Sequence, residues 1–208
     1  SESYGTDMYL SSMWLVENNI FHHITSAMQC ESGVGGVEAY NYVFDGFYNE
    51  TNPEWFQGSS YTHGACAYIL REGNIGQGFI QDVVHAPNYF HTALRNRWYG
   101  QQNDNFGNPQ SLQTVAVHIY APNRYNNILG NVLGTTGYHT KYEAYPASAA
   151  DCDTSVFALG FGGNCGNGTV DNAADVRTSL LRWGNYDTVN AAVRWQSSEV
   201  PTADANYP

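Results

Sequence analysis

The stretch Ala67–Gly76, AYILREGNIG, decides the fold, because its apolar lead-in ends at an asparagine that recurs along the chain. Its relatives are LVENNIF, VEAYNYVF, ALRNRWYG, ILGNVLG and LLRWGNYD, and each places a hydrophobic segment a few residues before an asparagine. The aligned asparagines are Asn19, Asn41, Asn74, Asn96, Asn131 and Asn185. Six occurrences in 208 residues indicate a repeat.

The spacing of these asparagines gives the period of the repeat. The gaps are 22, 33, 22, 35 and 54 residues, so two gaps are equal. The others exceed multiples of 22 by 11, 13 and 10 residues, the last if one coil between Asn131 and Asn185 is degenerate. Segments rich in Gly, Pro, Asn and Ser lie in these gaps, and we expect loop insertions near residues 45–60, 101–113 and 141–172. The alternative is a chance alignment of a frequent residue.

A 22-residue unit is too short for a helical hairpin and suits one coil of a β-solenoid. Pieces such as TVAVHIY (114–120) are short and β-branched or aromatic, and no segment shows a long apolar stripe of helical period. We therefore predict an all-β fold with one domain over residues 1–208. The repeated asparagines are predicted to form a ladder, each side-chain amide bonding to its neighbours at the same corner of successive coils.

Composition excludes some functional classes. The chain has 8 Lys+Arg against 19 Asp+Glu, and a net charge of -11 disfavours nonspecific binding to nucleic acid or anionic membranes. No apolar run approaches the ~18 residues that a membrane span needs, so no membrane insertion is expected. Four cysteines and a single lysine favour a secreted or extracellular protein.

The cysteines give two predictions. Cys152 and Cys165 enclose a loop rich in Gly and Asn, and we predict a disulfide there, with two free buried thiols as the alternative. Cys30 and Cys66 fall three positions apart in the repeat, which is roughly 10 Å along a strand. We predict that this second pair does not form a disulfide.

Several segments resemble a known family. LVENNIFHHI, THGACAYILREGN, DVVHAPNYFHT (82–92), NNILGNVLGTTGYHT and LLRWGNYDTVNAAVRW are similar to the C-terminal coils of secreted parallel β-helix proteins of the pectin-lyase-like superfamily. The resemblance covers about residues 13–195 and implies a right-handed parallel β-helix of about six to eight coils. It also implies a larger parent solenoid, of which this chain is the C-terminal part, or an unusual N-terminal cap.

The resemblance does not transfer an activity. The superfamily includes polysaccharide lyases, polygalacturonase-type hydrolases, phage tailspikes, adhesins and passive fibres. The polygalacturonase strings Asn-Thr-Asp, Asp-Asp, Gly-His-Gly and Arg-Ile-Lys are absent from this sequence. No tight aspartate cluster matches the calcium site of pectate lyases. Either chemistry would need a new site.

One position in the repeat predicts such a site. Eleven residues before the ladder asparagines stand Met8, Cys30, His63, His85 and Tyr120. His63 and His85 are 22 residues apart, which would place them about 5 Å from each other in stacked coils. Together with Asp82 they would form an acid/base pair or share a divalent metal, the one cofactor suggested. Arg95 or Arg97 would hold an anionic sugar. The alternative is a stacked imidazole pair in the solenoid wall.

Aromatic residues suggest carbohydrate binding. Trp55 and Phe56, in the first insertion, and Tyr89 and Phe90 are candidates for a platform that stacks on sugar rings, or else they only dock their loops on the wall. Two functions of different classes follow. The first is an exported protein that binds or processes polysaccharide along a lateral groove. The second is a structural or adhesive solenoid subunit whose partners are further copies of itself.

Overall fold

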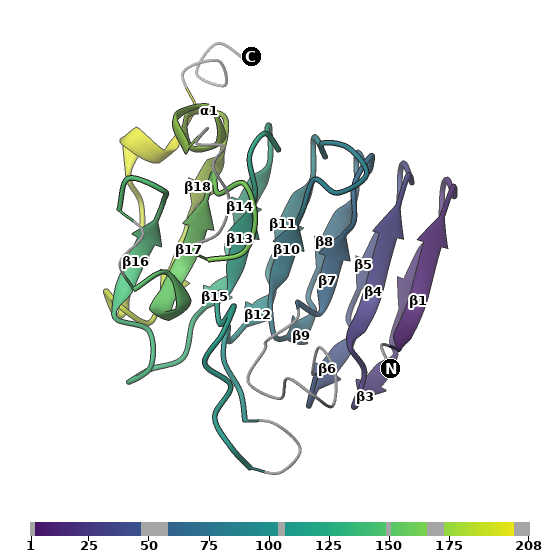
Figure 1. Cartoon of the computed structure of the whole chain (residues 1–208), viewed down its shortest axis with the longest axis horizontal. Coiled ribbons are helices and arrows are strands. Elements are labelled where there is room, and N and C mark those ends of the chain that lie inside the picture. The colour runs from purple at the N-terminus through teal and green to yellow at the C-terminus, as the bar shows by residue number, and fades with distance from the viewer. Residues whose placement is uncertain (1–2, 47–57, 104–106, 149–150, 166–172, 202–208) are drawn as a thin grey trace.

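The structure is a computed structural model that describes residues 3–46, 58–103, 107–148, 151–165 and 173–201 (Figure 1). Its strands form three sheets. Sheet I contains, in order, β1 (Tyr4–Tyr9), β4 (Ser26–Glu31), β7 (Ser60–Thr62), β10 (Phe79–Gln81), β13 (Val117–Ile119), β17 (Ser155–Leu159) and β16 (Lys141–Ala144). Sheet II contains β18 (Leu181–Trp183), β14 (Asn127–Leu129), β11 (Thr92–Leu94), β8 (Leu70–Glu72), β5 (Val37–Ala39) and β2 (Leu15–Glu17). Sheet III contains β20 (Ala192–Arg194), β19 (Asn185–Asp187), β15 (Val132–Leu133), β12 (Arg97–Trp98), β9 (Ile75–Gly76), β6 (Tyr42–Phe44) and β3 (Ile20–His22).

The chain visits the three sheets in rotation. The order sheet I, sheet II, sheet III holds for β1–β3, β4–β6, β7–β9, β10–β12, β13–β15 and β17–β19, and we call each such pass a circuit. Neighbouring circuits pair in parallel, whereas β20 turns back and pairs antiparallel with β19. Figure 1 shows the circuits side by side along the long axis of the molecule, with α1 (Ala173–Thr178) beside the last of them. The fold is therefore all-β with parallel sheets.

A continuous asparagine ladder runs along the corner between sheets II and III. Each asparagine Nδ2 donates to the Oδ1 of the asparagine in the next circuit at 2.9–3.0 Å. Each Oδ1 also accepts the backbone N–H of the preceding ladder residue. The members are Asn19, Asn41, Asn74, Asn96, Asn131 and Asn185. The corner is thus cross-linked from the first circuit to the last.

The longest gap in the ladder does not hide a coil. Asn131 Nδ2 donates directly to Asn185 Oδ1 at 2.9 Å, so the expectation of a degenerate coil between them is wrong. The 54-residue gap is one circuit with 54 − 22 = 32 extra residues. These residues lie on both sides of β17, in a segment that adds β16 at the sheet edge and in one that carries α1.

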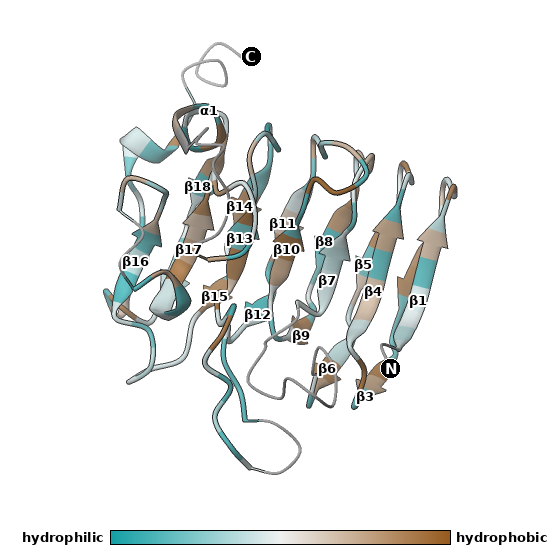
Figure 2. Ribbon diagram, in the orientation of Figure 1, coloured by the Kyte–Doolittle hydropathy of each residue, from teal (hydrophilic) through white to brown (hydrophobic). Residues whose placement is uncertain are grey.

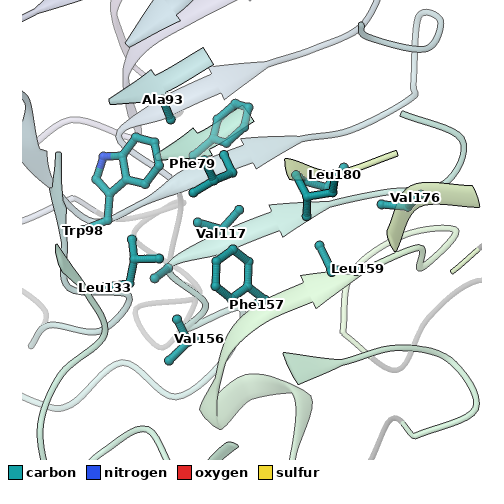
Figure 3. Packing of buried hydrophobic residues seen from close by; sticks show 13 residues of the cluster. Phe79, Ala93, Trp98, Val117, Leu133, Val156, Phe157, Leu159, Val176 and Leu180 are labelled. Carbon is teal, nitrogen blue, oxygen red and sulfur yellow. The ribbon is translucent and has the colours of Figure 1, made fainter. Parts of the chain in front are cut away.

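The core lies between the sheets and is densest in the last three circuits. Phe79, Val117 and Phe157 stand in register on sheet I and are fully buried. Trp98 and Leu133 of sheet III pack beside them in the same cluster (Figure 3). Along each strand of sheet I, the residues between these core residues face away from the core. Figure 2 shows the alternating hydrophobic and hydrophilic bands on β4.

An ion pair is buried inside the circuits. Glu38 and Arg71 are neighbours in register on sheet II, both fully buried, and Arg71 Nε lies 3.1 Å from Glu38 Oε2. Arg71 Nη1 donates to His91 Nδ1 at 2.9 Å, and His91 Nε2 donates to the Cys66 carbonyl at 3.0 Å. Burial and the neighbouring Arg71 hold the pKa of His91 well below its ordinary value, so its imidazole is neutral. Breaking this pair would leave an uncompensated buried charge.

Two disulfides staple the chain. Cys152 is bonded to Cys165. Cys30 is bonded to Cys66, with a Cα–Cα distance of 6.5 Å, so the expectation that this pair stays apart is wrong. The reason is the backbone at Gly64 and Ala65, whose φ values of 99° and 57° turn the chain round a corner instead of extending it along a strand. Two disulfides are consistent with an extracellular protein.

No helix within the described ranges is long and apolar enough to cross a membrane.

Candidate functional site

The outer face of sheet I carries the residues of the candidate site. Phe79 belongs to the core, and Gln81 bonds to the buried Asn126, so both side chains face inward. Because side chains alternate along a strand, Ile80 and Asp82 face outward. Strand pairing places Asp7, Gln29, Tyr61, Ile80 and His118 in one outward row. The backbone hydrogen bonds that continue the sheet place Tyr9, Glu31, His63, Asp82 and Tyr120 in the next.

Three of these residues form a hydrogen-bonded group centred on Asp82. His63 Nδ1 donates to Asp82 Oδ2 at 2.6 Å, and Tyr61 Oη donates to the same oxygen at 2.5 Å. The other carboxylate oxygen, Oδ1, accepts the backbone N–H of Val84 at 3.3 Å. The Asp82 side chain is only 4% exposed, whereas that of His63 is 23% exposed. The Asp82 carboxylate is therefore buried beneath the outer face of sheet I, and the His63 imidazole bonded to it reaches the surface.

This arrangement fixes the chemistry of His63. Because Nδ1 donates to a carboxylate, the neutral imidazole carries its proton on Nδ1 and presents the lone pair of Nε2. Nε2 has no hydrogen-bond partner within the described part of the chain. The hydrogen bond to Asp82 raises the pKa of His63, against the opposing effect of burial. The geometry suits a histidine that takes and returns a proton, with Asp82 orienting it.

His85 reaches His63 by a different route from the predicted one. The register partner of His63 is Asp82, 19 residues on, so the expected column of two stacked histidines is wrong. The corner after β10 is three residues longer than the corner after β7, since Thr62 pairs with Gln81 while Ala67 pairs with Tyr89. The extra residues bulge outward, and the His85 ring folds back to lie edge-on at 4.5 Å from the His63 ring.

Two further carboxylates border the group. Glu31 precedes His63 in the outward row, and its Oε1 lies 3.7 Å from His85 Nε2. Asp7 is exposed in the row below, where partial burial and the nearby Glu31 raise its pKa while a hydrogen bond from Gln29 lowers it. Asp7 and the firmly bonded Asp82 are therefore carboxyl groups in unlike environments, and they stand three strands apart in sheet I.

The predicted arginine partners lie elsewhere. Arg95 follows β11 at the corner between sheets II and III and pairs there with Glu72. Arg97 is on sheet III, where its Nη1 donates to the Gly134 carbonyl at 2.8 Å. Neither arginine takes part in the contacts of the His63 group.

The aromatic candidates divide into two sets. Trp55 and Phe56 lie outside the described residues. Phe90 is in an exposed stack with Tyr68 and Tyr125, with ring centroids 5.0 and 5.2 Å apart and planes tilted by 10° in each pair. Tyr89 touches the stack at an angle. Because both faces of Phe90 already contact rings, a sugar would have to stack on the end of the row, at Tyr68 or Tyr125.

No group of three metal-ligating side chains occurs among the residues that the structure places. A shallow depression of about 330 Å³, bounded by Asn190 and residues 192–196, lies at the β20 end of the molecule and contains none of the outward-facing site residues. The candidate site is therefore on the open outer face of sheet I and not in this depression.

Sequence reasoning missed Tyr61, Glu31 and Asp7. Tyr61 lies two residues before His63 in the same circuit. Glu31 and Asp7 lie one and two circuits away, and only the true strand register brings them close to His63. The one available signal was the length of residues 82–88, three longer than the equivalent 63–66.

No family model, curated protein or solved structure matches the chain.

Proposed function

We propose that the protein is a secreted right-handed parallel β-helix of the pectin-lyase-like type, and that it binds and processes polysaccharide on the outer face of sheet I. Rotation through three parallel sheets supports the β-helix, and parallel crossovers are right-handed almost without exception. The two disulfides support export. The face extends across several circuits, so a linear polymer can lie along it.

One observation carries the proposal: the hydrogen-bonded group of Tyr61, His63 and Asp82 on the surface. A buried carboxylate that fixes the tautomer of a partly exposed histidine is the arrangement of a proton-transfer site. His63 is the group that exchanges the proton, and Asp82 and Tyr61 position it. Asp7 supplies a second carboxyl group that is more easily protonated than usual.

The test is a panel of soluble polysaccharides assayed for new reducing ends, for unsaturated products and for binding by calorimetry. His63→Ala should abolish turnover, and Asp82→Asn should lower kcat by about 10²–10⁴. His22→Ala, at an exposed histidine of β3 in sheet III, is the matched control and should leave turnover unchanged. Failure of every glycan to bind would contradict the proposal.

A structural or adhesive role is the second candidate, because β1, β2 and β3 border the three sheets at one end with one edge unpaired in the described chain. Leu10, Met13, Leu15 and Ile20 of this first circuit are exposed. Unpaired strand edges are templates for further chains. Size-exclusion light scattering and negative-stain microscopy decide this candidate: filaments growing from the β1 end support it, and a monomer at all concentrations refutes it.

A further inference from the structure

The charges that face the His63 group indicate the class of glycan, an inference that rests on the proposed function. Asp7, Glu31 and Asp82 lie on this face, and no Lys or Arg occurs in β1, β4, β7, β10 or residues 82–91. We propose that the site takes a glycan bearing protonated amines, of the glucosamine-polymer type, in preference to a uronate.

Every Lys and Arg side chain of the protein is engaged away from this face. Arg71 is in the core, Arg95 pairs with Glu72, and Lys141 donates to Ser148. Arg124 is at the corner after β13 and pairs with Asp175. Arg97 bonds to carbonyls of sheet III, and Arg177, Arg182 and Arg194 bond to Glu143 and Glu199. A uronate would meet carboxylates without a Lys or Arg to pair with, and the net charge of -11 adds to the repulsion.

The carboxylates on the face are only partly neutralised. Asp82 is matched by His63, and Glu31 has His85 at 3.7 Å. Asp7 forms no ion pair within the described part of the chain, and its pKa is raised by partial burial and by Glu31. A bound cation beside Asp7 and Glu31 would offset their mutual repulsion, because opposite charges favour the ionised form. An ammonium group is such a cation.

A second observation points to a donor-bearing ligand at the same place. Gln29 stands between Asp7 and Tyr61 in the outward row and is 1% exposed. Its Oε1 has no hydrogen-bond partner in the described structure. A buried acceptor left unpaired costs free energy until a donor reaches it. An ammonium carries three N–H donors and can serve Gln29 and a carboxylate together.

The experiment compares oligosaccharides of equal length by calorimetry at low ionic strength. A glucosamine oligomer, kept protonated, is measured against its fully N-acetylated counterpart, which has the same backbone without the charge. An oligogalacturonate is measured with and without Ca²⁺. The amine oligomer should bind at least about tenfold more tightly than the acetylated one, and the difference should shrink as salt is added.

Three single substitutions separate the site from general electrostatics. Asp7→Asn and Glu31→Gln should each weaken amine binding by about three- to tenfold and leave the acetylated oligomer unaffected. Glu17→Gln removes the same charge from the exposed strand β2 of sheet II and should change nothing. An equal loss in all three variants would attribute the preference to net charge and would overturn the assignment to this site.

The two proposals fail in different ways. Tighter binding of the uronate, with or without Ca²⁺, would overturn the inference and leave the glycan function standing. Equal binding of the amine and acetylated oligomers, abolished by His63→Ala, would do the same. Absence of binding for all three oligomers would overturn the inference, and failure of every polysaccharide of the panel to bind would overturn the proposed function as well.

Discussion

At the scale of single residues, the buried Asp82 carboxylate accepts the Nδ1–H of His63 and so fixes which imidazole nitrogen carries the proton. Tyr61 donates to the same oxygen, and burial together with the Asp82 charge raises the pKa of the Tyr61 hydroxyl, so this donor stays protonated. The carboxylate thus remains fully bonded while the imidazole changes state. A single buried acceptor therefore organises the whole group.

The raised pKa of His63 makes a pH-dependent contribution to stability. Its folded pKa lies above its unfolded value, so the contribution is fully present below about pH 6.5 and is lost as the pH rises through the folded pKa. Asp82→Asn should lower the pKa of His63 and remove about 1 kcal/mol from the free energy of unfolding at the acid side of this window. NMR titration of the histidine ring protons measures the shift. An unchanged pKa for His63 in the variant would contradict the hydrogen bond.

His118 has the opposite behaviour. Its ring is fully buried on the outer face of sheet I, both nitrogens lack partners in the described structure, and burial lowers its pKa to about 3. Below about pH 6.5, His118 is protonated in the unfolded chain but stays neutral in the folded chain. The free energy of unfolding therefore falls as the pH is lowered from about 6.5 towards the folded pKa. One such group contributes a slope of about 1.4 kcal/mol per pH unit.

His118→Leu should therefore raise the free energy of unfolding by about 1 kcal/mol at neutral pH and flatten the acid slope by one proton. Urea denaturation across the pH range measures both quantities. Part of the slope should remain in the variant, because His91 is also buried in its neutral form. A variant with an unchanged slope would show that His118 has a partner in the folded protein.

At the scale of elements, the asparagine ladder ties one circuit to the next. Asn96 is 1% exposed and bonds to the Asn74 backbone N–H, the Asn74 and Asn131 side chains and the Arg71 carbonyl, so its side chain satisfies four buried groups. Asn19 occupies the same corner in the first circuit, where it is exposed and has a ladder neighbour on one side within the described chain. The two positions differ in burial and not in chemistry.

This difference gives a paired prediction. Asn96→Ala should lower the free energy of unfolding by about 3 kcal/mol or more, because it leaves buried donors and acceptors unpaired. Asn19→Ala should cost about 1 kcal/mol or less, since water replaces the lost bonds. Chemical denaturation of both variants gives the comparison. Equal losses would mean that the ladder stabilises through local turn geometry and not through buried hydrogen bonds.

Structural features that use the same residue in every circuit could be predicted from the sequence. Features that depend on the length of a corner could not. The ladder was visible because asparagine recurs in each circuit. A second ladder, in which Asn88 Nδ2 donates to Asn123 Oδ1 at 3.1 Å, escaped notice because Cys66 fills its next position. The pairing of His63 with Asp82 could not be predicted from the spacing of the ladder asparagines. In this circuit a longer corner is offset by a shorter one, so the spacing stays at the common period and shows neither change.

At the scale of the whole molecule, packing is uneven along the stack. The largest apolar cluster joins the circuits of β10, β13 and β17, whereas the first two circuits share a smaller cluster around Phe21 and Met28. A stacked protein is stabilised circuit by circuit through its neighbours. The free energy of local opening should therefore rise from β1 towards β13.

Hydrogen exchange followed by mass spectrometry tests this gradient. Amides of β10, β13 and β17 should exchange slowest, and those of β1–β3 fastest, because the first circuit has one neighbour and little buried apolar area. Reduction of the Cys30–Cys66 disulfide, which joins the second and third circuits, should speed exchange there before it affects β17. Uniform protection along the stack would contradict a circuit-by-circuit scheme.

The longer corner after β10 has a consequence for how such a protein can change. Its three added residues displace His85 towards His63, yet the next corner residue, Tyr89, returns to the common register with Ala67. An insertion there is absorbed within a single turn of the chain, and no strand is shifted. Corner length is thus a variable that selection or a protein engineer can adjust independently of the scaffold, repositioning a reactive side chain while the stacked strands keep their neighbours.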